Sequence, residues 1–214
     1  MGEELVLALG IAASPFPIVP AILLLFTPRP RPTSLAFLGG WFGGIAAATG
    51  VFVLLAGALE PGGGSPTWLS WVRIAVGAAL VVYGARQWFA RAAGGEPPAW
   101  MTSLQDATPR SAVRLALLLS VANPKVVLLA AAAGLDLGTA DLTAAGTVGA
   151  VALFAAVASI SVAVPVLLFA ARGEAVLVPL ARVRDWLLRH SDAILAVVIA
   201  VIGLVLIKNG VAGL

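Results

Sequence analysis

Long, uninterrupted apolar runs are the feature that most limits what this chain can fold into. An α-helix needs about 20 apolar residues to cross a hydrocarbon core roughly 30 Å thick. Six runs reach that length: Leu5–Phe26, Leu35–Leu59, Trp68–Trp88, Ala112–Leu135, Leu142–Ala171 and Ala193–Leu214. The runs do not alternate with polar residues, which argues against membrane strands. The sequence therefore predicts an all-α, multi-pass integral protein of the cell membrane with six transmembrane helices.

Composition excludes several other classes of protein. Of the 214 residues, 61% are hydrophobic and only 11% are charged, too few to cover a water-facing surface. No cysteine and only one histidine occur, so we expect no metal site and no cofactor. No carboxylate pair or Ser–His pair falls within a span, so we expect no catalytic residues and no enzyme. The pI near 10.2 comes from basic residues spread over short loops, which indicates membrane topology and no nucleic-acid partner.

The charges of the loops predict the orientation in the membrane. Arginines concentrate after the first, third and fifth spans: Arg29, Arg31, Arg86, Arg91, Arg110, Arg172, Arg182, Arg184 and Arg189. Acidic residues dominate the opposite side: Glu3, Glu4, Glu60, Asp136 and Asp141. By the positive-inside rule, the basic loops lie in the cytoplasm and both termini lie outside.

The spans fall into two sets of three. Residues 1–92 are predicted to form the first three-helix repeat, residues 93–110 a flexible cytoplasmic connector, and residues 111–214 the second repeat. Each half opens with a helix interrupted by proline, and an odd number of spans in each half makes the second run opposite to the first. This is the 3+3 inverted-repeat plan, in which paired broken helices mark a substrate site near the midplane of the membrane.

Two segments of the second repeat carry expectations of their own. The fifth span is overlong, so it tilts or ends near Pro165. Residues 174–190 have apolar side chains at helical spacing and arginines on another face, namely Arg182, Arg184 and Arg189. This pattern predicts a helix on the inner membrane surface, with its arginines near anionic head groups. The alternative is an ordinary solvated connector.

Lys125 is the residue that indicates function most directly. A lysine near the centre of a membrane helix costs roughly 2.5–3.5 kcal/mol, so such a residue usually faces the bundle interior or a water-filled cavity. The alternative is a side chain that extends to the inner head groups. Pro124 cannot donate a hydrogen bond, which frees a carbonyl near Ser120 or Val121. Asn123 could satisfy that carbonyl or bind a ligand.

The first span offers a matching interruption. Ser14, Pro15 and Pro17 free further backbone groups, and with residues 123–125 they predict a small polar pocket whose positive charge favours an anionic substrate. The alternative is that the prolines only kink the helices. No acidic residue lies in the middle of any span to couple transport to protons or sodium, and Asp192 is better explained as a helix cap.

Glycines at 39, 40, 43 and 44 form small-xxx-small patterns in the second span. Such patterns allow helices to approach closely. Packing within one chain is the favoured interpretation, and the alternative is a face for a homodimer.

These motifs also resemble a known family. The segment SPFP, the following ILLLFTPRPRPTSLAFLGGWFGG and the later ANPKVVLLAAAAG are similar to the GAP family of peptidoglycolipid-addressing, Sap-like proteins, part of the lysine-exporter superfamily. The resemblance covers nearly the whole chain. It implies export, and it implies that Ser14, Pro15, Pro17 and residues 123–125 match the substrate-path motifs of the family.

Three functions remain open at this point. The leading hypothesis is a transporter or flippase that exports an anionic polar lipid, such as a glycolipid or a lipid-linked precursor, or a small anionic solute. The second is an exporter of amino acids or ions, as the superfamily implies. The third is a membrane scaffold for envelope assembly that transports nothing.

Overall fold

The computed structural model describes residues 2–59 and 106–187 continuously, together with single residues at 71, 74, 75, 78, 82, 86, 104, 189, 190, 204, 208 and 211. Every regular element among them is helical, as the apolar runs predict. Two described helices are long and apolar enough to cross a membrane, or up to four if each of two bent pairs forms one span. The predicted third and sixth spans and most of connector 93–110 lie outside the described residues, so the count of six stays a prediction.

The first predicted span is a helix in two pieces. Helices α1 (Gly2–Ala12) and α2 (Pro15–Leu24) meet at an angle of 53°. Pro15 holds the first helical position of α2, and proline disfavours helical geometry in the residue before it. Ser14 is accordingly extended, with φ −75° and ψ 127°. The predicted interruption of this span is confirmed.

The fourth predicted span is divided in the same way. Helices α5 (Pro109–Val121) and α6 (Pro124–Thr139) meet at 68°. Asn123 is extended, and Pro124 begins α6, where its missing N–H costs nothing because the first turn of a helix has no carbonyl partner for it. The second predicted interruption is therefore also confirmed.

The fifth predicted span has a break that the sequence did not indicate. Helices α7 (Ala144–Ala158) and α8 (Ile160–Arg172) are separated at Ser159. The expectation of an end near Pro165 is wrong, because that proline lies inside α8. A proline removes one backbone hydrogen bond and crowds the carbonyl four residues earlier, but neighbouring helices can support it inside a span. Helix α8 ends instead at Gly173, whose φ of +64° suits glycine.

Helix α3 (Pro30–Leu59) is continuous and packs along both α5 and α6. Four glycines stand at these contacts: Gly40, Gly44, Gly134 and Gly138. A Cβ atom at Gly44, for example, would overlap Ser120 of α5. By contrast, Gly39 and Gly43 have nothing within 4 Å of where a Cβ would lie. One face of the glycine pattern therefore packs within the chain, as predicted.

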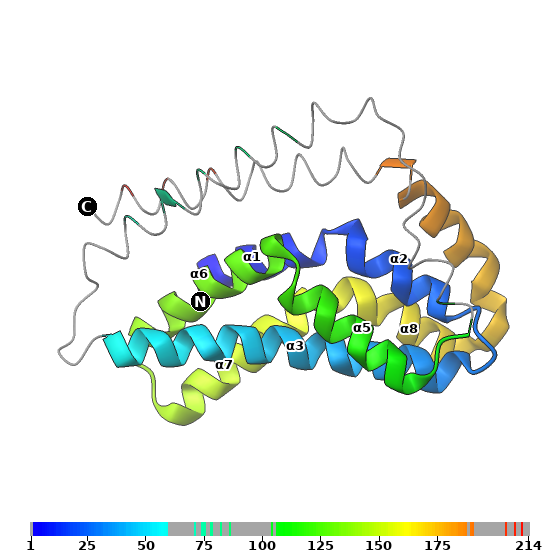
Figure 1. Ribbon diagram of the computed structural model, residues 1–214, viewed down its shortest axis with the longest axis horizontal. Coiled ribbons are helices and arrows are strands. Elements are labelled where there is room, and N and C mark those ends of the chain that lie inside the picture. The colour runs from blue at the N-terminus through cyan, green and yellow to red at the C-terminus, as the bar shows by residue number, and fades with distance from the viewer. Residues whose placement is uncertain are drawn as a thin grey trace.

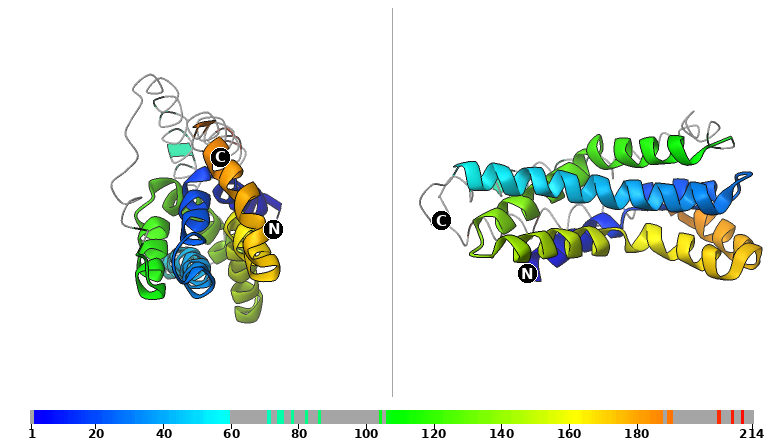
Figure 2. Two further views of the ribbon diagram at one scale, coloured as in Figure 1. Left: turned by 90° about the vertical axis from the view of Figure 1, so that its right-hand side faces the viewer. Right: turned by 90° about the horizontal axis from the view of Figure 1, so that it is seen from below.

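The described spans alternate in direction (Figure 1). The early part of α3 faces α5 and its later part faces α6, so α3 runs parallel to that broken pair. Helix α1 contacts α7 and α2 contacts α8, so these two broken spans also run parallel to each other. Figures 1 and 2 show the two sets running in opposite directions. This is the relative direction that the predicted order requires of the first, second, fourth and fifth spans. Each broken span also packs along a span of the opposite half of the sequence.

Charge separates between the two ends of this bundle. One end gathers the start of α3, the start of α5 and the end of α8, with Arg29, Arg31, Arg110, Arg114 and Arg172. The other end gathers the start of α1, the end of α6 and the start of α7, with Glu3, Glu4, Asp136 and Asp141. We call these the basic end and the acidic end. The described residues thus show the charge asymmetry on which the predicted orientation depends.

Candidate functional site

The proline breaks place polar side chains inside an apolar core. Helix α1 contacts α6 and α2 contacts α5, so the two breaks lie at matching heights in the bundle. Ser14 stands at the first break and is 2% exposed, and Lys125 stands at the second and is 4% exposed. The structure therefore buries both of these predicted site residues in the middle of the molecule.

Lys125 is buried without a partner. Its Nζ makes no hydrogen bond to any residue that the structure describes. A lysine that extended to the head groups would expose this atom, so the side chain does not take that alternative here. No acidic residue occurs between Glu4 and Glu60 or between Asp106 and Asp136, so the surrounding spans supply no carboxylate. An anion that pairs with Lys125 would therefore have to come from outside these spans.

Asn123 serves the helix that carries Lys125. Its Oδ1 accepts a hydrogen bond of 3.1 Å from the backbone N–H of Lys125, which makes it the N-cap of α6. Pro124 is exposed, and its part is to begin the helix rather than to line the core. Of the predicted NPK motif, only the lysine places a side chain deep in the core.

Ser14 holds the same N-cap position in α2, but its hydroxyl caps nothing. An N-cap side chain normally accepts from the second or third residue of the helix, and the third residue here is Pro17, which has no N–H. Pro15 and Pro17 are both buried. Pro17 thus removes one of these two donors, and the Ser14 hydroxyl is unpaired among the described residues, inside the core.

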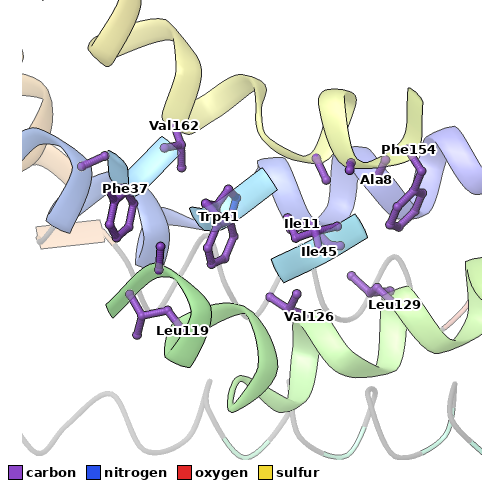
Figure 3. Packing of buried hydrophobic residues seen from close by; sticks show 14 of the residues in the cluster. Ala8, Ile11, Phe37, Trp41, Ile45, Leu119, Val126, Leu129, Phe154 and Val162 are labelled. Atoms are coloured by element: carbon purple, nitrogen blue, oxygen red, sulfur yellow. The ribbon is translucent and has the colours of Figure 1, made fainter. Parts of the chain in front are cut away.

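Two further side chains of this region carry no obvious sequence signal. Trp41 of α3 is fully buried and its Nε1 has no described partner, and Ser159, at the third break, is 3% exposed with an equally unpaired hydroxyl. Figure 3 shows Trp41 at a height between Leu119 of α5 and Val126 of α6, the segment that contains the second break. A tryptophan in a glycine-rich helix is most simply explained as packing, so only the structure reveals its free N–H.

One protein family matches this chain. The family model described as Sap, sulfolipid-1-addressing protein (SfLAP), matches residues 5–212. The chain belongs to this family. The resemblance inferred from the motifs is thereby confirmed, and the match includes both broken spans and Lys125. No curated protein and no solved structure matches the chain.

This Sap-family chain continues from α8 through a short 3₁₀ helix, η3 (Gly173–Val176), into a helix over residues 177–187. The apolar spacing of this segment predicts a face turned to the membrane. In the structure much of that face packs on the protein instead, because Val176 and Leu180 form a cluster with Ile22, Leu25 and Phe169. The position of the helix on a membrane surface stays a prediction.

The three arginines of the predicted surface helix differ in their surroundings. Arg182 and Arg189 are exposed. Arg184 forms an ion pair of 2.7 Å with Asp185, and its guanidinium lies 5.7 Å from the centre of the Phe26 ring. Arg182 and Arg189 are therefore more accessible to an anionic head group than Arg184 is.

Proposed function

We propose that this protein is a membrane exporter of the flippase type, which moves a polar lipid with an anionic head group from the cytoplasmic side outward. The buried Lys125 carries this proposal. Removing a charge from water without a counter-charge costs several kcal/mol, and intramembrane charges that persist commonly serve substrate or ion pathways. The family name supports the same chemistry, because a sulfolipid carries an anionic sulfate.

The surface beside the third break could hold the acyl chain of a lipid substrate. An open apolar hollow of about 470 Å³ runs along α8, lined by Ile160, Ala163, Val164, Leu167 and Leu168. It begins one residue after Ser159, whose buried hydroxyl has no partner among the described residues. An acyl chain could occupy the hollow while its head group sits among the buried polar side chains.

The breaks supply the movement that alternating access requires. Helices α2 and α6 both begin at a break, so the partial positive charges of their N-termini add to that of Lys125. A change in the angle at either break would open the centre toward one end while the continuous α3 holds the bundle together. Broken helices serve this purpose in transporters built from inverted repeats.

Lipid movement in liposomes tests the proposal. The protein is reconstituted with a sulfated galactosylceramide that carries a fluorescent acyl chain, and its transfer between leaflets is followed by quenching from outside. We expect Lys125→Met, which keeps the length of the side chain, to slow transfer at least about tenfold, since it removes a charged hydrogen-bond donor. Lys125→Arg is the control that keeps the charge, and we expect it to retain part of the rate.

The controls separate the competing functions. The uncharged parent galactosylceramide should move slowly in every variant, because it lacks the anionic group. Wild-type rates of sulfated lipid in Lys125→Met would contradict the proposal. Movement of an amino acid but not of either lipid would favour the small-solute exporter, and movement of neither would favour the scaffold.

A further inference from the structure

Helix α3 carries unpaired polar side chains at three heights. Thr33, Trp41 and Thr49 are each 0% exposed. Thr33 Oγ1, Trp41 Nε1 and Thr49 Oγ1 have no hydrogen-bond partner among the residues that the structure describes. The three follow one another at equal intervals along the helix, and at 1.5 Å per residue Thr33 and Thr49 stand roughly 24 Å apart. That distance is most of the thickness of a hydrocarbon core.

Some hydroxyl groups of this bundle are paired, whereas those of Ser14, Ser159 and Ser161 have no partner among the described residues. A helical serine or threonine can donate to a carbonyl three or four residues earlier. Thr27 donates to the Leu24 carbonyl at 2.7 Å, and Ser120 donates to the Leu117 carbonyl at 2.9 Å. Thr33 and Thr49 do not pair in this way, although a helix offers them the same kind of acceptor. A buried hydroxyl without a partner destabilises a protein, so a role other than stability is needed to explain these positions.

The three heights match the rest of the molecule. Thr33 lies in the first turn of α3, at the basic end. Trp41 lies about one turn to the basic side of the second break, because Gly40 and Gly44 beside it pack on residues 113–120 of α5. The backbone of Thr49 packs beside Gly134 of α6, beyond the break toward the acidic end, since a Cβ on that glycine would lie 2.5 Å from the Thr49 carbonyl oxygen.

We propose that the three unpaired polar groups of α3, which turn by about 80° around its axis from one to the next, mark the path of the head group through the protein. Thr33 receives it near the cytoplasm, Trp41 and Lys125 hold it at the midplane, and Thr49 releases it toward the outside. The path rests on the proposed function, because it supposes an anionic head group that Lys125 binds. Threonine hydroxyls and the indole N–H donate to sulfate or phosphate oxygens and replace the water that the head group loses.

Substitutions that remove the polar atom test this path. Thr33→Val and Thr49→Val should leave the thermal stability unchanged or higher, because each removes an unpaired buried group. Trp41→Phe also removes ring volume from the core and should lower stability, so its rate is compared per folded molecule. Each of the three variants should slow transfer of the fluorescent sulfated lipid about tenfold, since a donor to a charged group is lost. Thr33→Ser and Thr49→Ser keep the hydroxyl and should restore the rate.

Thr27→Val is the matched control, because it breaks a hydrogen bond that the structure shows. We expect this variant to lower stability and to leave the rate per folded molecule unchanged. Wild-type rates in the three path variants, beside a slow Lys125→Met protein, would overturn the path and leave the proposed function standing. A fully active Lys125→Met protein would overturn the proposed function, and the path with it. Path variants that behave like Thr27→Val would show that these groups only stabilise the fold.

Discussion

At the scale of single residues, two N-caps at equivalent breaks have opposite states. Asn123 uses its side-chain oxygen to hold the first turn of α6, whereas Ser14 leaves its hydroxyl free at the start of α2. Pro17 removes the N–H of the third helical residue, which is one of the two donors that a serine cap can use. The cap at the second break is thus hydrogen-bonded, whereas the first break keeps the Ser14 hydroxyl available to a ligand.

Stability should separate the two caps. Asn123→Ala should lower the free energy of unfolding by about 1 kcal/mol, which is the usual loss for an N-cap. Ser14→Ala removes no hydrogen bond to a described residue and should have little effect. Thermal unfolding of the purified variants in the same detergent measures both. Equal losses would mean that the Ser14 hydroxyl has a structural partner after all.

An N–H at position 17 should occupy the Ser14 hydroxyl in a hydrogen bond. Pro17→Ala supplies an N–H at the third position of α2, which the serine hydroxyl can then bind. We expect higher stability and slower transfer of the sulfated lipid, because the hydroxyl is no longer free. The double variant Ser14→Ala with Pro17→Ala is the control, since its stability gain from the cap should vanish. An unchanged transfer rate in Pro17→Ala would exclude Ser14 from the substrate site.

At the scale of helices, the sequence predicts a break where its cause is local. The motifs at residues 14–17 and 123–125 stop helices because proline acts on its immediate neighbours. Ser159 has no proline beside it, and the break there depends on packing that no single segment reveals. The predicted end near Pro165 was wrong because surrounding helices can support a proline inside a span.

The sequence likewise predicts only those site residues that are unusual in their local context. Lys125 stands out because a charge in an apolar run is unusual wherever the helix packs. Thr33, Trp41 and Thr49 do not stand out, because such residues are usually paired or simply packed. Whether a given hydroxyl finds a partner is decided by rotamers and neighbours in the folded protein.

Helix packing gives a prediction based on two neighbouring glycines. Gly44→Ala should push α3 away from α5, because its Cβ would also lie 2.9 Å from the Cβ of Ser120. Gly43→Ala has open space and should be neutral or slightly stabilising, since alanine favours helix. Melting temperatures of the two variants test this. If Gly43→Ala proved the more harmful, that face would have to pack on a partner, such as a second copy of the chain.

At the scale of the whole molecule, the separation of charge allows a direct test of orientation. The chain has no cysteine, so single cysteines can be introduced without background. Glu3→Cys and Asp141→Cys should react with an impermeant maleimide on intact cells, because the acidic end is predicted to lie outside. Arg29→Cys and Arg110→Cys should react only after the membrane is opened. The reverse pattern would invert the orientation, and labels at both ends from outside would contradict a single topology.

The packing of each broken span on the opposite half has a consequence for biogenesis. Helix α3 leaves the ribosome well before α5 and α6 are made, and synthesis proceeds at roughly 5–20 residues per second. For several seconds the glycines and unpaired polar groups of α3 therefore have no native neighbour in the bilayer. An insertase or chaperone that shields this surface would be needed at that stage, and a chain cut short before α5 should be a preferred substrate for membrane proteases.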